Sequence, residues 1–596
     1  MRILLRFTAI ALVVASVGLY FMPRSSTIPQ PAFTISLVDP YANEVLEPYR
    51  RLRDALLNDD LFILAELADN ESGYLAFRAH FALARHPEIT AVKRLEHYSQ
   101  VLELRVDDPL ARAERQELYL EVALTAEVNG YIQQALAAYE EALPHPRALD
   151  SLERLQDNPY RLSNTLFKAR LNRAALNALD GRTAPSIEAP AYRALGEHQA
   201  ALDAYERWLA EAPDDLDARF GEAWSHFYLG NLDTAERLFA GLQGSSALYG
   251  RALIANRTGE LDRAVSLLQQ SGRASHLWLA SGLLEAKDRY QDAIPVYLQL
   301  AQTDSVYADD AAYRALVLSK RFNDEAGFLQ AETLIPSGSF FALKLGNLPE
   351  LPSGSQLADE QHPVLELATA LARAGNRDAA IGELLFALRD TPDEATAVAI
   401  AELLQSLGEY RQSQVAAQVY LSQGSQNLRT WRLAYPRAYP QFVEPEAAKR
   451  QLEPELIWAI MRQESAFYPE ALSRSNAQGL MQVIPSTWDW LAELQREAPG
   501  DPFEPSENIR YGAHYLAWLH NYHSGDLELI ITSYNRGQGY IRRLFEGPIV
   551  NRDKDEFYRE IDALETREYL QKVVVNYRLY KALYQGETQQ TAEASR

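Results

Sequence analysis

Residues 452–488 read LEPELIWAIMRQESAFYPEALSRSNAQGLMQVIPSTW. Pro454 suits a first helical turn, and apolar residues that recur three and four apart after it predict one buried helix face. These residues are Leu456, Ile457, Ile460 and Met461. Because Glu464 follows at the same spacing, its carboxyl lies on the apolar side of that helix. Apolar surroundings favour the neutral form of a carboxyl and raise its pKa, so we predict that Glu464 is a general acid.

Three short segments after the helix interrupt regular structure. Phe467 to Pro469 is predicted to stop the helix, and Asn476 to Gly479 to form a flexible turn. Leu480 to Gln482 is predicted to open a new helical piece. The helix that carries the acid would therefore be followed by a turn and then by a new helical piece.

Two later segments complete an ordered set of motifs. Ser533 to Asn535 precede a loop at Gly537 and Gly539, and Glu565 to Tyr569 stand at the head of another amphipathic helix. The set resembles the soluble lytic transglycosylases, enzymes of goose-lysozyme-like fold that cut bacterial peptidoglycan. The family motifs Glu-Ser, Gly-Leu-Met-Gln, Ala-Tyr-Asn and Glu-Thr-Arg-x-Tyr stand here as Glu464-Ser465, Gly479 to Gln482, Ser533 to Asn535 and Glu565 to Tyr569.

The resemblance implies a reaction that needs one carboxyl. In the family a single glutamate protonates the glycosidic oxygen and then takes a proton from the sugar's own 6-hydroxyl, which leaves a 1,6-anhydro sugar. An intramolecular nucleophile has a high effective concentration, so an enzymic nucleophile and a bound water become dispensable. Glu464 would be that residue, acting on the β-1,4 bond between N-acetylmuramic acid and N-acetylglucosamine.

The same resemblance implies a set of substrate-binding residues. They are Ser465, Gly479, Leu480, Met481, Gln482, Tyr534, Asn535, Glu565 and Tyr569. We expect Ser465 to bond the substrate or to hold the carboxyl, and Gln482 to bond sugar amides and hydroxyls. We expect Tyr534 to direct its hydroxyl at Glu464 or at developing positive charge. Met481 is expected to be both core and wall of the site.

Other interpretations stay open. A lysozyme-like hydrolase would need a second carboxylate or an oriented water, and the remaining acidic residues of this region are most simply solvated or helix-capping. A scaffold that binds glycan without cutting it is a further alternative. Mass spectrometry of digested cell wall separates the transglycosylase from the hydrolase. Glu464→Gln tests the scaffold.

The motifs depart from the family pattern at three positions. Ser533 replaces alanine, while Arg536 and Gln538 replace the alanine and proline of Ala-Gly-Pro-Gly, which puts the subsite preferences in doubt. Three histidines on one helix suggest a metal, but no Cys or acidic partner has ligand spacing, so we expect no metal and no cofactor. These histidines are His514, His520 and His523.

Composition places the chain among large exported globular proteins. Its 596 residues with 47% hydrophobic content predict at least two domains. The formal net charge of −23 repels phosphate backbones, so nucleic acid is not an expected partner, and glycan strands would be held by hydrogen bonds and by the 8 Trp and 32 Tyr. The 0 Cys exclude disulfides and zinc-thiolate sites.

The first residues have the pattern of a secretory leader. Arg2 and Arg6 precede the apolar run Phe7 to Met22. The large residues at the end of the run leave the cleavage site open, so residues 1–24 are either a signal peptide or an anchor that associates the protein with a membrane. We therefore expect a periplasmic protein that acts on peptidoglycan and works beside other cell-wall enzymes.

From about Ala32 to Tyr435 the sequence predicts helix after helix, with a repeating register. Tight turns are expected at Gly130, Gly196, Gly230, Gly259, Asp288, Gly375 and Gly408. Small residues stand five positions later, at Ala135, Ala201, Ala235, Ala264, Ala293, Ala380 and Ser413. Large ones stand nine positions later, at Tyr139, Tyr205, Phe239, Leu268, Tyr297 and Leu384, although Ala417 breaks the rule. Pro213 and Pro392 end second helices, and the arm resembles stacked tetratricopeptide-like hairpins.

The predicted fold class is therefore all-α. A helical-hairpin superhelix at 25–350 and a helical linker at 351–440 precede a lysozyme-like domain at 441–586. The prolines around 349–363 and 436–440 mark the joints. The last helix is predicted over Thr566 to Tyr584 with Gly586 at its cap, and residues 587–596 form a frayed tail. The resemblance implies that the arm closes into a ring beside the catalytic domain.

Overall fold

The computed structural model describes residues 44–594, except 105–110, 348–350, 353, 355–356, 358–361, 390–391, 474 and 562. The described residues form helices and turns, and their extended pairings are isolated bridges at Gln478. The predicted all-α class is confirmed. The predicted leader at 1–24 lies outside the described residues. Within them, no helix has the length and apolar character needed to cross a bilayer.

The N-terminal arm is a succession of short antiparallel helices, in which neighbours along the chain also pack together. Its elements are η1 (Glu44–Leu46), α2 (Glu47–Asn58), α3 (Leu61–Asn70), α4 (Gly73–Arg85), α5 (Ala91–Leu104), α6 (Ala111–Val128), α7 (Ile132–Glu141), α8 (Pro146–Leu155), α9 (Pro159–Lys168), α10 (Asn172–Ala178), α11 (Pro185–Ala194), α12 (His198–Glu211), α13 (Leu216–Tyr228), α14 (Leu232–Ala240), α15 (Ser245–Arg257), α16 (Leu261–Ser271), α17 (Ala274–Glu285), α18 (Tyr290–Ala301), α19 (Ala308–Arg321), α20 (Glu325–Leu334) and α21 (Phe340–Lys344).

The repeat register is confirmed. All seven predicted turn residues have positive φ, and every small residue five positions later is fully buried. Each large residue nine positions later is buried, and for Tyr205 and Phe239 the room comes from a glycine on the next helix. A Cβ added at Gly221 would lie 2.0 Å from the Tyr205 ring, and one at Gly250 would lie 2.6 Å from Phe239. Hairpins therefore stack through matched large and small residues.

After the arm come the helices of the predicted linker, α22 (Pro363–Arg373), α23 (Arg377–Arg389), α24 (Glu394–Ser406), α25 (Tyr410–Ser422) and α26 (Leu428–Ala434). The C-terminal helices are α27 (Pro440–Arg450), α28 (Pro454–Ser465), α29 (Pro485–Gln495), α30 (Pro505–Tyr522), α31 (Leu527–Arg536), α32 (Gln538–Glu546), α33 (Lys554–Glu560) and α34 (Leu564–Ala594). The domain limits at 350 and 440 stay predictions, because one hydrophobic core runs from Phe340 through Tyr439 to Trp458.

The last helix is longer than predicted. It does not end at Tyr584 with Gly586 as its cap, since α34 continues to Ala594. One glycine inside a helix costs only about 1 kcal/mol relative to alanine, and the residues after Gly586 are mostly good helix formers. The tail at 587–594 is therefore helical in its backbone, and the prediction of a frayed end was wrong there.

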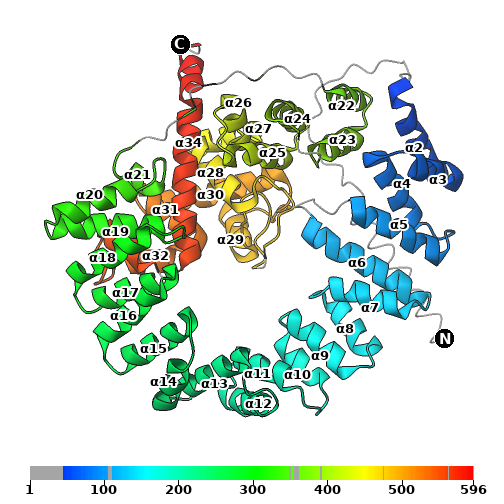
Figure 1. Cartoon of the computed structure of the whole chain (residues 1–596). Coiled ribbons are helices and arrows are strands. Elements are labelled where there is room, and N and C mark those ends of the chain that lie inside the picture. The colour runs from blue at the N-terminus through cyan, green and yellow to red at the C-terminus, as the bar shows by residue number, and fades with distance from the viewer. Residues whose placement is uncertain are drawn as a thin grey trace.

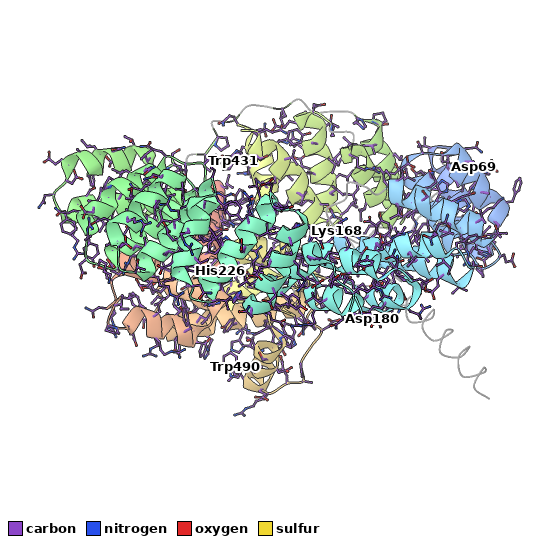
Figure 2. The ribbon with its side chains drawn as sticks, turned by 60° about the horizontal axis from the view of Figure 1, so that its bottom comes forward. Asp69, Lys168, Asp180, His226, Trp431 and Trp490 are labelled. Atoms are coloured by element: carbon purple, nitrogen blue, oxygen red, sulfur yellow. The ribbon has the colours of Figure 1, made fainter. Side chains whose placement is uncertain are left out.

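The arm curves into a closed ring, with the C-terminal helices on its inner side (Figure 1). The ring closes where α2 to α4 pack against α22 to α24 in one shared core. At that seam the Tyr49 hydroxyl donates to Glu383, and the Tyr74 ring lies against Gly382. In the turned view of Figure 2, α29 with Trp490 stands out from the level of the arm helices.

Candidate active site

Helix α28 carries the predicted acid near its end. It begins at Pro454 as predicted, and its apolar face is buried, with Ile457, Ile460 and Met461 at 0% exposure. Glu464 is its penultimate residue, so the carboxyl stands where regular structure stops. The two residues after Ser465 have left-handed backbone conformations, with φ of +48° at Ala466 and +66° at Phe467. Such conformations are costly for residues other than glycine and persist only where packing imposes them.

The Glu464 carboxyl is enclosed by protein but keeps part of its surface accessible. Burial raises its pKa to about 7, against a hydrogen bond from Tyr569 that lowers it, while the nearby charge of Glu565 raises it further. A carboxyl with this pKa is partly protonated at neutral pH. It can therefore both donate and accept a proton under the same conditions.

Tyr569 on α34 is the direct partner of the acid. Its hydroxyl donates to Glu464 Oε1 over 2.6 Å, and its side chain is 5% exposed. Tyr534 does not fill this role, contrary to the expectation. Its hydroxyl donates instead to the Met481 carbonyl over 2.8 Å, although its pKa is raised well above the usual value by burial and by the neighbouring Glu464 charge.

The Gly479 to Gln482 motif forms a turn and not the start of a helix. Residues Gln478 and Val483 bond each other's backbones in both directions, so the four residues between them make the tip of a short hairpin. Positive φ at Gly479 (+74°) and Gln482 (+49°) prevents helical continuation. The next helix, α29, begins only at Pro485.

Asn508 on α30 holds this turn and was not among the predicted site residues. Its amide oxygen accepts from the Met481 backbone over 2.7 Å, and its amide nitrogen donates to the carbonyls of Gln478 and Pro502. The side chain is fully buried. A signal existed in the sequence, because Asn508 stands four residues before Gly512 on the apolar face of α30, where an amide is unexpected.

Gly479 has to be glycine for two reasons. Its backbone has positive φ, and a Cβ there would lie 2.2 Å from both the Asn508 side chain and the Pro502 carbonyl. Gly512 is similarly constrained, since a Cβ there would lie 2.2 Å from the Met481 sulfur.

Three predicted substrate ligands bond to the protein. The Ser465 hydroxyl lies 2.7 Å from the Leu480 carbonyl, so it ties α28 to the turn. The Gln482 amide donates to the carbonyls of Ala471 and Gly479. Met481 and Leu480 are fully buried, which makes Met481 a core residue. These side chains hold the turn in place through contacts with the protein.

The Ser533 to Asn535 motif ends α31. Ser533 is buried and lies 2.7 Å from His523 Nε2, so the substituted hydroxyl has a partner. The Asn535 side chain accepts from Thr566 over 2.7 Å, which links α31 to the start of α34. Gly537 alone separates α31 from α32, and Gly539 lies inside α32, so the predicted loop is a one-residue joint.

Aromatic rings lead outward from this motif. Tyr515 lies 5.3 Å from Tyr534 between ring centres and 6.3 Å from Trp490, and Trp518 lies 5.2 Å from Trp490. The hydroxyl of Tyr515 donates to Gln538, one of the substituted positions. The rings form a partly exposed row on α29 and α30 that starts beside the acid.

No side chain of this region suggests a metal centre. Among the described residues, His, Asp and Glu form no group of three or more that could hold a metal ion. A cavity of about 650 Å³ lies elsewhere, lined mainly by α9, α11, α12 and α13 of the arm. Its walls include Tyr205, Trp208 and Trp224, and it contains none of the predicted site residues.

A protein-family model matches the part of the chain that contains Glu464. Residues 441–554, which include Glu464, match the model described as the transglycosylase SLT domain. This part of the chain is similar to the SLT domain and is called by that name below. The predicted relationship to lytic murein transglycosylases is confirmed for it, and Glu565 and Tyr569 lie beyond the matched range.

Relatives match in the same part of the chain. A putative soluble lytic murein transglycosylase of Haemophilus influenzae is 34% identical over 161 residues, which are 26% of this chain and 27% of the relative. A membrane-bound lytic murein transglycosylase C of Yersinia pestis is 34% identical over 168 residues, 24% of this chain and 47% of the relative. The chain thus spans between a quarter and a half of the length of these curated relatives.

Solved structures resemble the whole chain. The 70-kDa soluble lytic transglycosylase in complex with bulgecin A has a TM-score of 0.57 at 17% identity and covers 90% of this chain and 96% of its own. An inactive mutant of the lytic transglycosylase Slt from Pseudomonas aeruginosa has a TM-score of 0.51 at 20% identity, covering 90% and 94%. The fold, arm and SLT domain together, is therefore that of these proteins.

Proposed function

We propose that the chain is a peptidoglycan lytic transglycosylase. It cleaves the β-1,4 bond between N-acetylmuramic acid and N-acetylglucosamine without water and leaves 1,6-anhydro-muramic acid ends. The observation that carries the proposal is the Glu464 carboxyl, which lies in the SLT domain and accepts a hydrogen bond from Tyr569. Its pKa of about 7 suits both directions of proton transfer.

The proton balance needs only this carboxyl. Protonated Glu464 donates to the glycosidic oxygen as the bond from that oxygen to the anomeric carbon breaks. The 6-hydroxyl of the same muramic acid then bonds to the anomeric carbon and gives its proton to the Glu464 carboxylate, which restores the acid. Tyr569 stabilises the carboxylate in between, because its hydrogen bond favours the charged form.

The remaining predicted residues have supporting roles in this proposal. Ser465, Gln482 and Tyr534 hold the turn around Met481 rigidly beside the acid. Sugar rings stack on the row from Tyr515 to Trp490, since aromatic faces suit the apolar faces of saccharides.

Product analysis with Glu464→Gln tests the proposal. The parent chain should release 1,6-anhydro muropeptides from purified sacculi, seen by mass spectrometry as products lighter by one water than the reducing forms. Glu464→Gln keeps the size and a hydrogen-bonding end but cannot cycle a proton, so turnover should fall by a factor of about 1,000 or more. Unchanged turnover in this variant would reject Glu464 as the acid.

The second candidate is a lysozyme-like hydrolase. Glu565 favours it, because this exposed carboxylate lies close enough to act on the Glu464 charge and could orient a water. Products with only reducing muramic acid would support the hydrolase. A parent chain that binds sacculi and releases nothing would support the inactive scaffold.

The location and partners belong to the same proposal. Peptidoglycan lies outside the cytoplasmic membrane, so the chain acts in the periplasm, where the N-terminal segment also gives it membrane association and other cell-wall enzymes work beside it. Fractionation of cells that produce the full chain tests this, and enzyme recovered in the cytoplasm would contradict it.

A further inference from the structure

The arm meets the C-terminal helices that follow the SLT domain, α33 and α34. Toward α33 the contact is ionic, since Glu285 of α17 is fully buried between Arg314 of α19 and Arg559 of α33. Glu556 of α33 accepts from Arg314 in turn. Toward α34 the contact includes two further pairs, which involve the turn of helix that presents Tyr569.

The first pair joins Gln571 to Asp310, whose oxygen accepts from the Gln571 amide over 3.0 Å. The second pair joins Arg567 to Trp278, with the guanidinium carbon 4.8 Å from the ring centre. Arg567 is 6% exposed, so this cation lies largely out of water. Both arm residues belong to the helices that hold the ionic contact, α17 and α19.

Helix geometry relates these pairs to the acid. Arg567 and Gln571 are four residues apart and share one face of α34, whereas Tyr569, midway between them, points to the opposite face. The arm therefore contacts one face of this helical turn, and Tyr569 on the opposite face donates to Glu464. A hydrogen bond of 2.6 Å weakens steeply when its donor moves by a fraction of an ångström.

We infer that Trp278 and Asp310 of the arm are positioning residues for the catalytic carboxyl, acting through α34 to keep the Tyr569 hydroxyl on Glu464. The arm is thus part of the apparatus that sets the protonation of the acid. The inference rests on the proposed function only for its readout, because the contacts themselves are independent of the substrate.

Few titratable groups lie around Glu464 and around Asp310. Glu464 faces Tyr569 and Glu565 of α34 and, across the site, Tyr534 of α31. Asp310 has its pKa raised by burial and lowered again by Arg567 and Gln571, with Asp309 and Glu568 as acidic neighbours. Loss of the arm contacts frees Tyr569, and the pKa of Glu464 then rises, because the phenol lowers it.

The test compares pH profiles of the full chain on short, soluble glycan strands. In the proposed reaction the acid must start protonated, so kcat/KM falls as pH rises through the pKa of Glu464. Trp278→Ala and Gln571→Leu should each lower kcat about tenfold with little change in KM, and should move the falling limb to higher pH by about half a unit. Trp278→Phe, which keeps an aromatic face, should restore most of both.

Tyr313→Phe is the matched control. It removes the hydroxyl that donates to Asp555 of α33 over 2.8 Å, from the same arm helix as Asp310, and leaves α34 untouched. Its pH profile should be that of the parent. A falling limb that stays in place in Gln571→Leu, with or without loss of rate, would overturn the inference. If the parent itself releases no anhydro product, the proposed function fails instead.

Discussion

Two influences act on the Glu464 carboxyl in opposite directions. Burial raises its pKa to about 7, and the Tyr569 hydroxyl holds that rise back by bonding the charged form. Without the phenol the pKa of Glu464 would be higher. The balance between one hydrogen bond and the surrounding apolar packing therefore sets the working pH.

Tyr569→Phe should shift this balance without opening the structure. The variant keeps the ring and loses only the hydroxyl, so the pKa of Glu464 rises and the falling limb of kcat/KM should move up by about one pH unit. The rate at the pH optimum should fall ten- to a hundredfold. A stopped assay on sacculi between pH 5 and 9 measures both.

Tyr511→Phe provides the comparison. The Tyr511 hydroxyl donates to Glu497 over 2.8 Å, away from the acid. The falling limb of kcat/KM in this variant should therefore coincide with that of the parent. A downward shift in Tyr569→Phe would show that the phenol acts on something other than the carboxylate.

At this scale the acid was predictable and its partner was not. Helical spacing placed Glu464 correctly on a buried face, because one helix is a local structure. Whether Tyr534 or Tyr569 reaches it depends on how α31 and α34 pack, which is a tertiary property. Asn508 was missed because its three bonds go to segments six to thirty positions away.

At the scale of the helix, Tyr205 and Phe239 each fit over a glycine of the next hairpin. Phe239 is fully buried against Gly250 of α15, whereas a Cβ added at Gly282 of α17 would meet no neighbouring atom within 4 Å. Both glycines lie inside helices with ordinary backbone angles. They differ in their surroundings and not in their conformation.

Replacement of Gly250 and of Gly282 by alanine should therefore change the free energy of unfolding in opposite directions. Gly250→Ala forces Phe239 to move and should destabilise the arm by about 1–3 kcal/mol. Gly282→Ala reduces backbone freedom in the unfolded chain at no steric cost and should stabilise by about 0.5–1 kcal/mol. Calorimetric melting of the two variants checks both signs, and a loss in each would contradict the packing argument.

The repeat register shows how far such elements could be predicted. Glycine turns identified most of the hairpins, but another turn uses Arg170 at φ +62°, followed by buried Ala175 and Leu179 in the same register. It was missed because no glycine marked it. The turn at Gly479 was taken for a helix start because its positive φ at Gln482 has no sequence signal.

At the scale of the whole molecule, buried charges join the arm to α33, the helix that follows the SLT domain. Burial alone would raise the pKa of Glu285, but the hydrogen bonds and charges of Arg314, with Tyr297 and Arg559, lower it below the usual value. A group with a lowered pKa stabilises the folded state above its unfolded pKa, and this contribution is lost as pH falls through the folded value. The docking is thus weakest in acid.

Arg314→Met should loosen this docking strongly. The variant leaves Glu285 buried with one partner fewer, and breaking a buried ion pair costs about 3–5 kcal/mol. Arg173→Met removes an exposed pair with Glu197 and should cost less than about 1 kcal/mol. Hydrogen exchange of α17, α19 and α33 measures the difference, and equal protection in the two variants would contradict it.

The seam of the ring has a consequence for how the chain reaches this shape. Tyr49 and its partner Glu383 are 334 positions apart, and the first helices share their apolar core with that distant segment. During synthesis the apolar face of α2 to α4 stays exposed until most of the polypeptide has been made. Closure is then a late, slow event, and the early helices are where a chaperone would need to bind.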